Sequence, residues 1–359
     1  MTNTKKRVAL GMSGGVDSSL SAHLLTEQGY EVVGVYLECW RAPGCRTDQD
    51  RQDALKVALE LGMPFQVLDF KQQYRHQVVE YFFNEYKAGR TPNPDVMCNK
   101  EIKFGLFYDW AMTHDFDYVA TGHYAKSTEA GELLVPKDDW KDQTYFLYLL
   151  TQDQLQHTLF PLAKLTKDEV RAEAERRGIH VAEKKDSVGI CFIGDIDVRE
   201  FLRERLGEKP GEVVDHQGNV LGSHQGVWFY TIGQRHGFTI HPKSQITQAD
   251  GQVVERTNLP PFYVIGKDAV KNQLVVGFGA DAYRQTFAFT DLHLIDESAR
   301  LPTQLLARIR HTGEKIPAQI EDNRVKLAKE VKGISPGQSV VFYAETQDGV
   351  KCLGGAVIN

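Results

Sequence analysis

The chain has 359 residues, of which 42% are hydrophobic and 25% are charged, and its formal net charge is −6. This composition is typical of a globular protein and excludes a disordered or fibrous chain, and the length favours two or three domains. No stretch reaches the roughly 18 apolar residues that a membrane-spanning helix needs, and the first residues lack the apolar segment of a secretory signal. We therefore expect a cytoplasmic protein with no membrane partner.

The first half of the chain alternates between strand patterns and helix patterns. Strands are expected at 7–12, 31–37, 65–70 and 118–121, and helices at 20–28, 50–61, 72–88 and 166–177. The last of these helices opens with Thr166 and Glu169 at the spacing of a capping box. Regular alternation of strands and helices predicts an α/β fold with a doubly wound parallel sheet.

From about residue 207 the pattern changes to short β-type runs that are separated by glycines. A boundary between two small β-rich modules is expected near 281–287. We therefore predict three domains, at 1–205, 206–284 and 285–359, and expect the last of them to resemble a β-barrel.

Residues 11–19, with the sequence GMSGGVDSS, lie between the first expected strand and the first expected helix. A glycine-rich turn at this place lays backbone N–H groups and a helix N-terminus against a phosphate. Asp17 is placed to orient the loop or to hold a phosphate-bound Mg²⁺. The alternative is an ordinary glycine and serine turn with Asp17 as the helix cap. The candidate nucleotide-binding residues in this loop are Gly11, Met12, Ser13, Gly14, Gly15, Val16, Asp17 and Ser18.

Five widely spaced cysteines form neither a disulfide framework nor CxxC metal pairs. Cys98 follows Asp95 by three positions in the segment TPNPDVMCNKEIKFG. If a helix begins at Val96, Asp95 caps it and Cys98 lies in its first turn, where the helix dipole lowers the pKa of a thiol. Cys191 stands in a short apolar run after the charged residues 184–186. The alternatives are a buried helix cysteine beside a capping aspartate and a cysteine in the core of a strand.

Several motifs resemble those of a known family. SGGVDS resembles the signature of the PP-loop ATP pyrophosphatases, and NPDxxCN together with DSxGICF is similar to the tRNA-specific 2-thiouridylase family within that class. The resemblance continues through TGHYA (121–125), KDQTYFLY (141–148), YTIGQRHGF (230–238), SPGQ and CLGG, and it covers essentially the whole chain.

The resemblance implies a tRNA-uridine 2-sulfurtransferase that uses ATP and Mg²⁺. The C2 oxygen of the wobble uridine, position 34, is adenylated with release of pyrophosphate, and sulfur from a Cys191 persulfide then displaces AMP to give 2-thiouridine. Cys98 either releases hydrosulfide from the persulfide or captures Cys191 in a disulfide, and Asp95 serves as acid or base. The implied partners are tRNAs of the Lys, Glu and Gln types and a persulfide donor such as a cysteine desulfurase or a sulfur-relay protein. Cys39, Cys45 and Cys352 match no catalytic position.

The resemblance also implies binding residues outside the phosphate loop. Leu37 and Gly122 fall at positions that contact ATP. The positions that contact tRNA are Asn93, Pro94 and Asp95 at the target base, His123, Lys141, Asp142 and Gln143, and Arg308, Ile309 and Gln338 in the last module. The family often has an aromatic residue where this chain has Ile309, which makes a stacking role there doubtful. His123 as a core histidine and Lys141 as a solvated charge remain open, and no protein metal site is expected.

Two other functions remain as alternatives. The first is another PP-loop ligase or amidotransferase, which is disfavoured because no glutaminase segment is recognisable and both cysteines are present. The second is a tRNA-binding protein that has lost catalysis, which the intact SGGVDS motif, Asp95 and the cysteine pair disfavour.

Overall fold

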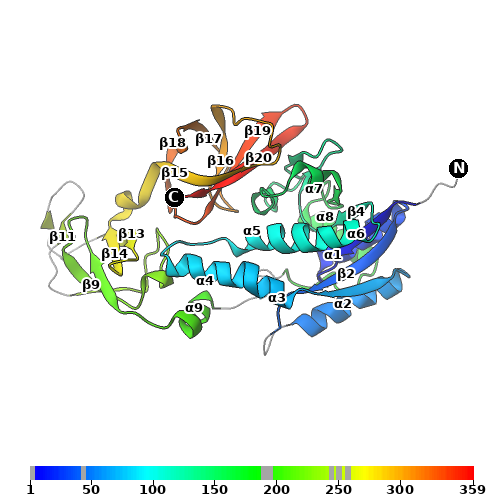
Figure 1. Cartoon of the computed structure of the whole chain (residues 1–359), viewed down its shortest axis with the longest axis horizontal. Coiled ribbons are helices and arrows are strands. Elements are labelled where there is room, and N and C mark those ends of the chain that lie inside the picture. The colour runs from blue at the N-terminus through cyan, green and yellow to red at the C-terminus, as the bar shows by residue number, and fades with distance from the viewer. Residues whose placement is uncertain (1–4, 42–45, 187–196, 242–245, 248–252, 255–259) are drawn as a thin grey trace.

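The computed structural model describes residues 5–41, 46–186, 197–241, 246–247, 253–254 and 260–359. Figure 1 shows an α/β unit on one side, a small β-rich unit on the other side, and a second β-rich unit above them. The predicted class, a doubly wound parallel-sheet domain followed by two β-rich modules, is confirmed.

The sheet of the α/β unit has five parallel strands in the order β3-β2-β1-β4-β7. The strands are β1 (Arg7–Gly11), β2 (Glu31–Glu38), β3 (Phe65–Asp69), β4 (Tyr118–Ala120) and β7 (Thr158–Leu159). The first four match the predicted strands to within one or two residues. Strand β7 was not predicted, because it has only two residues.

Helices cover both faces of this sheet. One face carries α1 (Val16–Glu27), α2 (Thr47–Glu60) and α8 (Lys167–Arg176). The other face carries α3 (Lys71–Tyr74), a π-helical segment (Arg75–Val79), α4 (Glu80–Lys87), α5 (Pro94–Cys98), a second π-helical segment (Asn99–Leu106) and α6 (Phe107–Thr113). Because successive strand residues point to opposite faces, Val8 and Leu10 of β1 pack in the first layer and Ala9 packs in the second.

Two of the predicted helix starts are informative. The capping box at the start of α8 is confirmed, since Thr166 accepts from Glu169 N and Glu169 accepts from Thr166 N. Helix α1 begins at Val16, four residues before the predicted start, because Gly15 in extended conformation serves as its N-cap. The helix therefore begins inside the glycine-rich loop.

The rest of the α/β unit consists of short elements. They are β5 (Lys126–Ser127), β6 (Leu133–Leu134), a 3₁₀ turn (Thr144–Phe146), α7 (Gln152–Gln156) and α9 (Val198–Leu206). No helix in the described part of the chain is both long and apolar enough to cross a membrane.

The first β-rich unit has a five-stranded sheet in the order β10-β9-β8-β14-β13. Its strands are β8 (Gly211–Val214), β9 (Val220–His224), β10 (Thr239–Ile240), β13 (Tyr263–Asp268) and β14 (Gln273–Gly277), with 3₁₀ turns at Val227–Phe229 and Gly279–Ala282. A separate hairpin joins β11 (Ile246–Thr247) to β12 (Val253–Val254).

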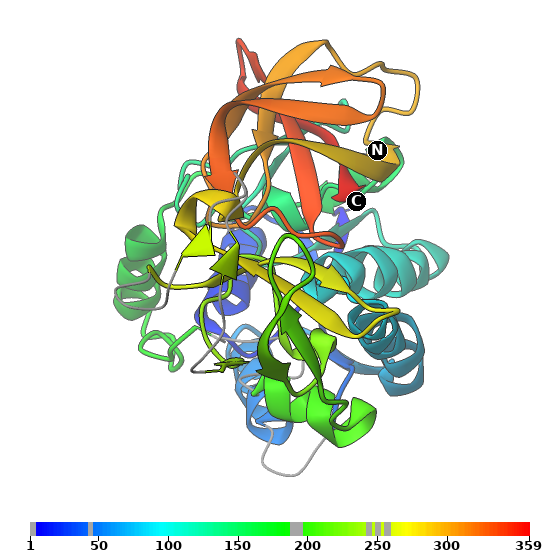
Figure 2. The same cartoon turned by 90° about the vertical axis from the view of Figure 1, so that its left-hand side faces the viewer.

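The second β-rich unit is a barrel, seen at the top of Figure 2. Its strands are β15 (Tyr283–Leu294), β16 (Gln304–Arg308), β17 (Ile316–Glu321), β18 (Arg324–Lys332), β19 (Ser339–Thr346) and β20 (Gly349–Ile358). The long strand β15 pairs with both β18 and β20, so the sheet closes on itself. Strands β6 and β5 of the α/β unit continue the sheet beyond β20.

Candidate functional site

The glycine-rich loop lies where the strand order of the parallel sheet reverses. Strands β1 and β4 are neighbours, and their carboxyl ends lead into residues 12–15 and 121–123. The two loops touch, because a Cβ atom added to Gly122 would lie 2.9 Å from the backbone nitrogen of Ser18. Ligands of open α/β sheets bind in the crevice at such a reversal point.

The backbone of the loop suits an anion. Gly14 has a φ of +71°, and a Cβ atom there would lie 2.1 Å from the carbonyl oxygen of Asp50, so only glycine fits. Gly15 caps α1 without a side-chain hydrogen bond, which leaves the first N–H groups of the helix for another acceptor. Ser18 Oγ donates to the carbonyl of Gly15 at 3.2 Å and accepts from Ser13 N at 3.2 Å, which holds the loop in shape.

Asp17 lies in the first turn of α1 and does not cap the helix, so the expectation of an Asp17 cap in the simpler interpretation of this loop was wrong. Lys167 Nζ lies 2.8 Å from each of its carboxylate oxygens, and Tyr124 donates its hydroxyl to Oδ1 at 2.8 Å. Burial, followed by the nearby charge of Asp17, raises the pKa of Tyr124 well above its ordinary value, so the phenol stays protonated. The carboxylate is therefore fixed beside the phosphate loop.

Lys167 is a site residue that was not predicted from the sequence. Its Nζ also lies 2.7 Å from Asp186, and Asp186 in turn accepts from Lys141 and Arg171 at 2.9 Å each. Burial alone would raise the pKa of Asp186, but hydrogen bonds from Lys167 and Lys141 hold it below its ordinary value. Lys141 is thus a partly exposed ion-pair partner of Asp186.

A second lysine ties the same segment to the loop. Lys184 Nζ donates to the carbonyl of Gly14 at 2.8 Å and to Asp50 and Asp53 at 2.7 and 2.6 Å. The residues just before the Cys191 segment are therefore fixed to the phosphate loop. Cys191 itself, like Cys45, lies outside the described residues.

Two other predicted nucleotide-binding residues, Met12 and Leu37, have buried side chains. Met12 is buried and donates its N–H to the carbonyl of Val35 at 2.8 Å, which fixes the loop to the end of β2. Leu37 packs its side chain in the core beneath the sheet. The Leu37 side chain is therefore not available to a ligand.

The structure places Cys98 deeper in its helix than predicted. The N-cap of α5 is Asn93, whose side chain accepts from Val96 N, and not Asp95, which lies in the first turn. Helix α5 begins at Pro94, so Cys98 is its fifth residue and lies beyond the first turn. The expectation that Asp95 caps the helix was wrong because Asn93 supplies the cap two residues earlier. The cysteine is fully buried and directly precedes a π-helical segment, a feature that is frequent at functional sites.

His123 is buried and neutral. Its Nδ1 lies 2.8 Å from Thr121 Oγ1, and its Nε2 lies 3.4 Å from Lys103 Nζ. The ammonium can only donate, so Nε2 accepts and the ring proton is on Nδ1. Burial, followed by the charge of Lys103, holds the pKa of His123 well below its usual value.

The KDQ segment links the α/β unit to the barrel. Asp142 is fully buried and accepts from Arg308 at 2.9 Å and from Lys315 at 3.0 Å. Gln143 and Tyr124 exchange two hydrogen bonds, at 2.9 and 3.0 Å. Two predicted tRNA contacts, Asp142 and Arg308, are therefore partners of each other in a buried ion pair.

The remaining predicted contacts on the barrel are also held within the chain. Ile309 is buried, and its carbonyl accepts from the Tyr145 hydroxyl at 3.4 Å. Gln338 donates its amide to the carbonyls of Thr91 and Pro92, at 2.9 and 3.1 Å. The barrel thus reaches the loop that leads into α5.

A histidine beside this junction gives a pH-dependent prediction. Burial, followed by the charge of Arg308, lowers the pKa of His311 to about 4. In the unfolded chain His311 takes up its proton near pH 6.5. The stabilisation that comes from the neutral, buried ring is therefore fully present above pH 6.5 and is lost as the pH drops towards 4. Because His311 is only partly buried, solvent screening reduces the effect, and between pH 7.5 and pH 5 we expect it to contribute a loss of about 1 kcal/mol, measured as the difference in urea unfolding between the wild type and His311→Asn. Equal pH dependence of the two proteins would contradict this assignment.

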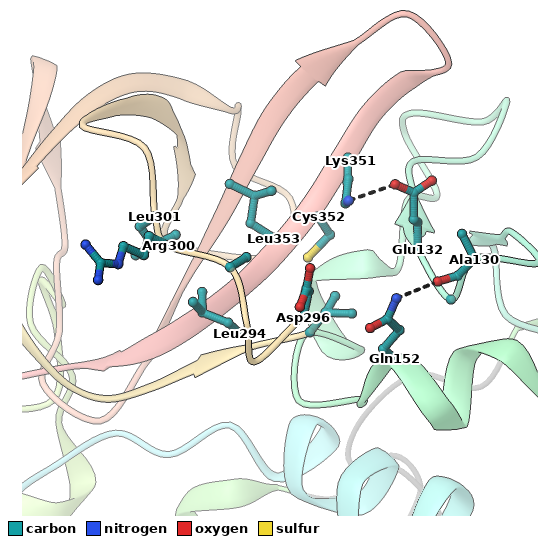
Figure 3. A pocket seen from close by; sticks show the side chains of 13 residues that line it. Ala130, Glu132, Gln152, Leu294, Asp296, Arg300, Leu301, Lys351, Cys352 and Leu353 are labelled. Atoms are coloured by element: carbon teal, nitrogen blue, oxygen red, sulfur yellow. Dashed lines mark hydrogen bonds and ion pairs between the residues drawn. The ribbon is translucent and has the colours of Figure 1, made fainter.

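A small cavity lies away from these residues, between the barrel and the α/β unit. Its volume is about 160 Å³, and its wall includes the Lys351–Glu132 ion pair and the bond from Gln152 to the carbonyl of Ala130 (Figure 3). Cys352, which also lines it, is fully buried, and burial raises the pKa of its thiol far above the usual range. This cysteine therefore remains protonated.

Three family models match consecutive parts of the chain. A tRNA methyl transferase HUP domain matches residues 6–195, a tRNA methyl transferase PRC-barrel domain matches 199–278, and an aminomethyltransferase beta-barrel domain matches 284–358.

Curated relatives align over nearly the full length. The tRNA-specific 2-thiouridylase MnmA of Listeria monocytogenes is 43% identical, with 99% of this chain and 95% of that protein covered. The same enzyme of Lactobacillus helveticus is 43% identical, with 99% and 96% covered, and that of Lysinibacillus sphaericus is 42% identical, with 98% and 94% covered.

Solved structures show more distant likeness. The U34-tRNA thiolase NcsA of Methanococcus maripaludis matches with a TM-score of 0.35 and 22% identity, over 48% of this chain and 57% of that one. A 4-thiouridine synthetase in complex with RNA and ATP matches with a TM-score of 0.36 and 16% identity, over 50% and 43% of the two chains. The near full-length identity to the curated relatives is decisive, and the chain belongs to the tRNA-specific 2-thiouridylase family.

Proposed function

We propose that this chain catalyses the ATP-dependent 2-thiolation of the wobble uridine, position 34, of tRNA. The observation that carries the proposal is the ionic chain Lys141–Asp186–Lys167–Asp17. It joins the phosphate loop, the KDQ motif and the residue that opens the segment with Cys191. The three reactants, ATP, tRNA and sulfur, would meet around this chain of charges.

The nucleotide would lie in the crevice between β1 and β4. Residues 11–18 would hold its phosphates, and Leu37 and Gly122 would contact it from the neighbouring strand ends. Asp17 Oδ1 accepts from both Lys167 and Tyr124, so Oδ2, which among the described residues has only Lys167 as a partner, is the carboxylate oxygen that would hold Mg²⁺ together with phosphate oxygens. The metal ion would offset the negative charge of the phosphates.

The reaction would proceed in two parts. The C2 oxygen of uridine attacks the α-phosphate of ATP, so an O–P bond forms and pyrophosphate leaves. Sulfur from the Cys191 persulfide then bonds to C2, and AMP leaves with the original oxygen. Cys98 either releases hydrosulfide from the persulfide before the transfer or cleaves the bond between Cys191 and the sulfur on C2 after it. Both routes leave a Cys98–Cys191 disulfide, which an external thiol must reduce before the next cycle.

The tRNA would contact the loop before α5, the KDQ segment and the barrel. Asn93, Pro94 and Asp95 would face the target base, with Asp95 as acid or base, and His123, Lys141 and Gln143 would contact neighbouring groups. Arg308, Asp142 and Ile309 are buried, so their contribution would be to orient the surfaces that bind tRNA. The substrates would be tRNAs of the Lys, Glu and Gln types, and a cysteine desulfurase or a sulfur-relay protein would load Cys191.

We further propose that each unit of the fold has its own function. Residues 1–205 would form the ATP-binding catalytic domain, 206–284 a small central domain, and 285–359 the tRNA-binding domain. The protein would act in the cytoplasm, where thiols remain reduced between cycles.

An assay with ATP, Mg²⁺, sulfide and tRNA that has uridine at position 34 tests the proposal. We expect 2-thiouridine by mass spectrometry, with one AMP and one pyrophosphate for each thiolated base. Conversion of ATP to ADP, or no thiolated base, would reject it.

Gly14→Ala provides a variant with a defined structural cause. A Cβ atom at this position would collide with the Asp50 carbonyl at a φ of +71°, and strain of about 1 to 3 kcal/mol corresponds to a loss of roughly 5- to 150-fold in turnover. Gly218→Ala is the matched control, because its φ is +85° but no atom lies within 4 Å of the added carbon. Equal activity of the two variants would show that the shape of the loop does not matter.

A further inference from the structure

A turn of the barrel, Ser335–Gln338, lies against the loop Arg90–Pro92. Thr91 donates its N–H to the carbonyl of Pro336 at 2.8 Å. Gln338 Nε2 donates to the carbonyls of Thr91 and Pro92, at 2.9 and 3.1 Å. An amide nitrogen carries two protons, so both donors of Gln338 are used within the chain.

The turn and the loop approach each other at backbone distance. Gly337 has a φ of +90°, and a Cβ atom there would lie 2.8 Å from Arg90 Cβ and 2.9 Å from Thr91 N. The turn is itself fixed to the last strand, since Gly337 donates to Ile358 at 2.9 Å and Ile358 donates to Gln338 at 2.8 Å. The barrel therefore offers a rigid support at this point.

The supported loop sets the start of the helix that carries Cys98. Asn93, the N-cap of α5, directly follows Pro92, and Asp95 and Cys98 lie in the five residues of that helix. The central β-rich unit reaches the same loop, since Thr231 Oγ1 lies 3.5 Å from Thr91 Oγ1. Thr91 is buried where the three units meet.

We propose that Gln338 is a positioning residue for Asp95 and Cys98, which it holds in place through the carbonyls of Thr91 and Pro92. This inference rests on the proposed function, in which Cys98 reacts, and it gives Gln338 a role other than direct contact with tRNA. Without the amide, the carbonyls of Thr91 and Pro92 lose their donor, and the start of α5 unfolds locally more often.

The test is the rate at which Cys98 in the full chain reacts with iodoacetamide, followed by peptide mass spectrometry with no tRNA or ATP present. Cys98 is fully buried, so its rate reports local opening of the helix. In Gln338→Ala we expect that rate to rise roughly 5- to 30-fold, the factor that corresponds to loss of one or two hydrogen bonds. The buried Cys39 and Cys352 serve as internal references and are expected to keep their rates.

Gln285→Ala is the matched control. Gln285 also donates its amide to a carbonyl, that of Leu327 at 2.9 Å, but this bond lies within the barrel. We expect Cys98 to react at the wild-type rate in this variant. Gln338→Lys, which keeps donors for the two carbonyls, is expected to restore most of the protection. An unchanged rate in Gln338→Ala, or an equal rise at all three cysteines, would overturn the proposal.

Turnover gives a second readout. For Gln338→Ala we expect kcat to fall while the KM for tRNA stays within about twofold, because the residue acts on the reacting groups and not on binding. A higher KM with unchanged kcat would instead make Gln338 a direct tRNA contact. The labelling experiment needs no thiolation, so it distinguishes an error in this inference from an error in the proposed function.

Discussion

Cys191→Ser is expected to reduce persulfide-dependent thiolation by about 10³-fold or more, because a hydroxyl cannot carry the transferred sulfur. The measurement is 2-thiouridine formed per enzyme after loading with a cysteine desulfurase and cysteine. Adenylation does not require the thiol, so tRNA-dependent release of pyrophosphate is expected to continue at a reduced level. Added sulfide is expected to restore part of the thiolation.

Cys98→Ser separates the two roles that remain open for Cys98. If Cys98 cleaves the bond between Cys191 and the sulfur on C2, the variant will accumulate tRNA linked to the protein through a disulfide that a reducing agent breaks. If Cys98 releases hydrosulfide from the persulfide, no linked species will form, and sulfide will rescue the variant fully.

The control for both variants is Cys352→Ala. Cys352 is buried beside the cavity between the barrel and the α/β unit and its thiol stays protonated, so activity near the wild type is expected. Full persulfide-dependent activity in Cys191→Ser would contradict the assignment of the sulfur carrier.

The parallel sheet could be predicted from the sequence because its signals are local. Strands β1 to β3 are mostly apolar segments of five to eight residues, and Thr166 and Glu169 form their capping box within one helical turn. Strands β5, β6 and β7 have two residues each, too few for any periodicity. Their pairing depends on partners far along the chain, as between β6 and β20.

The candidate site also has a part that could be predicted from the sequence and a part that could not. The phosphate loop could be recognised because its glycines and serines lie together in the sequence. Lys167 pairs with Asp17 across 150 positions, and apart from the helix cap that precedes it, it has no sequence signal of its own. The cap of α5 was misassigned because Asn93 and Asp95 are both good capping residues. Only the backbone decides between them, with Asn93 extended and the helix beginning at Pro94.

Asp142→Ala is expected to destabilise the protein by about 3 to 5 kcal/mol, since it leaves the buried guanidinium of Arg308 without its carboxylate, while Lys315 keeps Asp139 at 2.6 Å. Asp142 is fully buried and pairs with Arg308, whose side chain is 4% exposed, and with Lys315, whose side chain is 13% exposed. The same carboxylate accepts from the backbone and hydroxyl of Thr144, at 2.9 and 2.6 Å. Arg308→Met is expected to cost less, because Asp142 keeps Lys315 and Thr144 as partners. A double variant should therefore be more stable than the sum of the two single effects predicts.

The measurement is thermal unfolding, for which a loss of this size in a chain of 359 residues corresponds to a fall of roughly 4 to 7 °C in Tm. Lys329→Ala is the matched control. It breaks an ion pair of similar length, 2.6 Å to Glu314, but both side chains are more than half exposed, so a change of at most about 1 kcal/mol is expected. Equal shifts for Asp142→Ala and Lys329→Ala would contradict a structural role for the buried pair. If Asp142→Ala instead weakened tRNA binding at unchanged Tm, Asp142 would be a direct tRNA contact and the barrel would be held to the α/β unit by its other contacts.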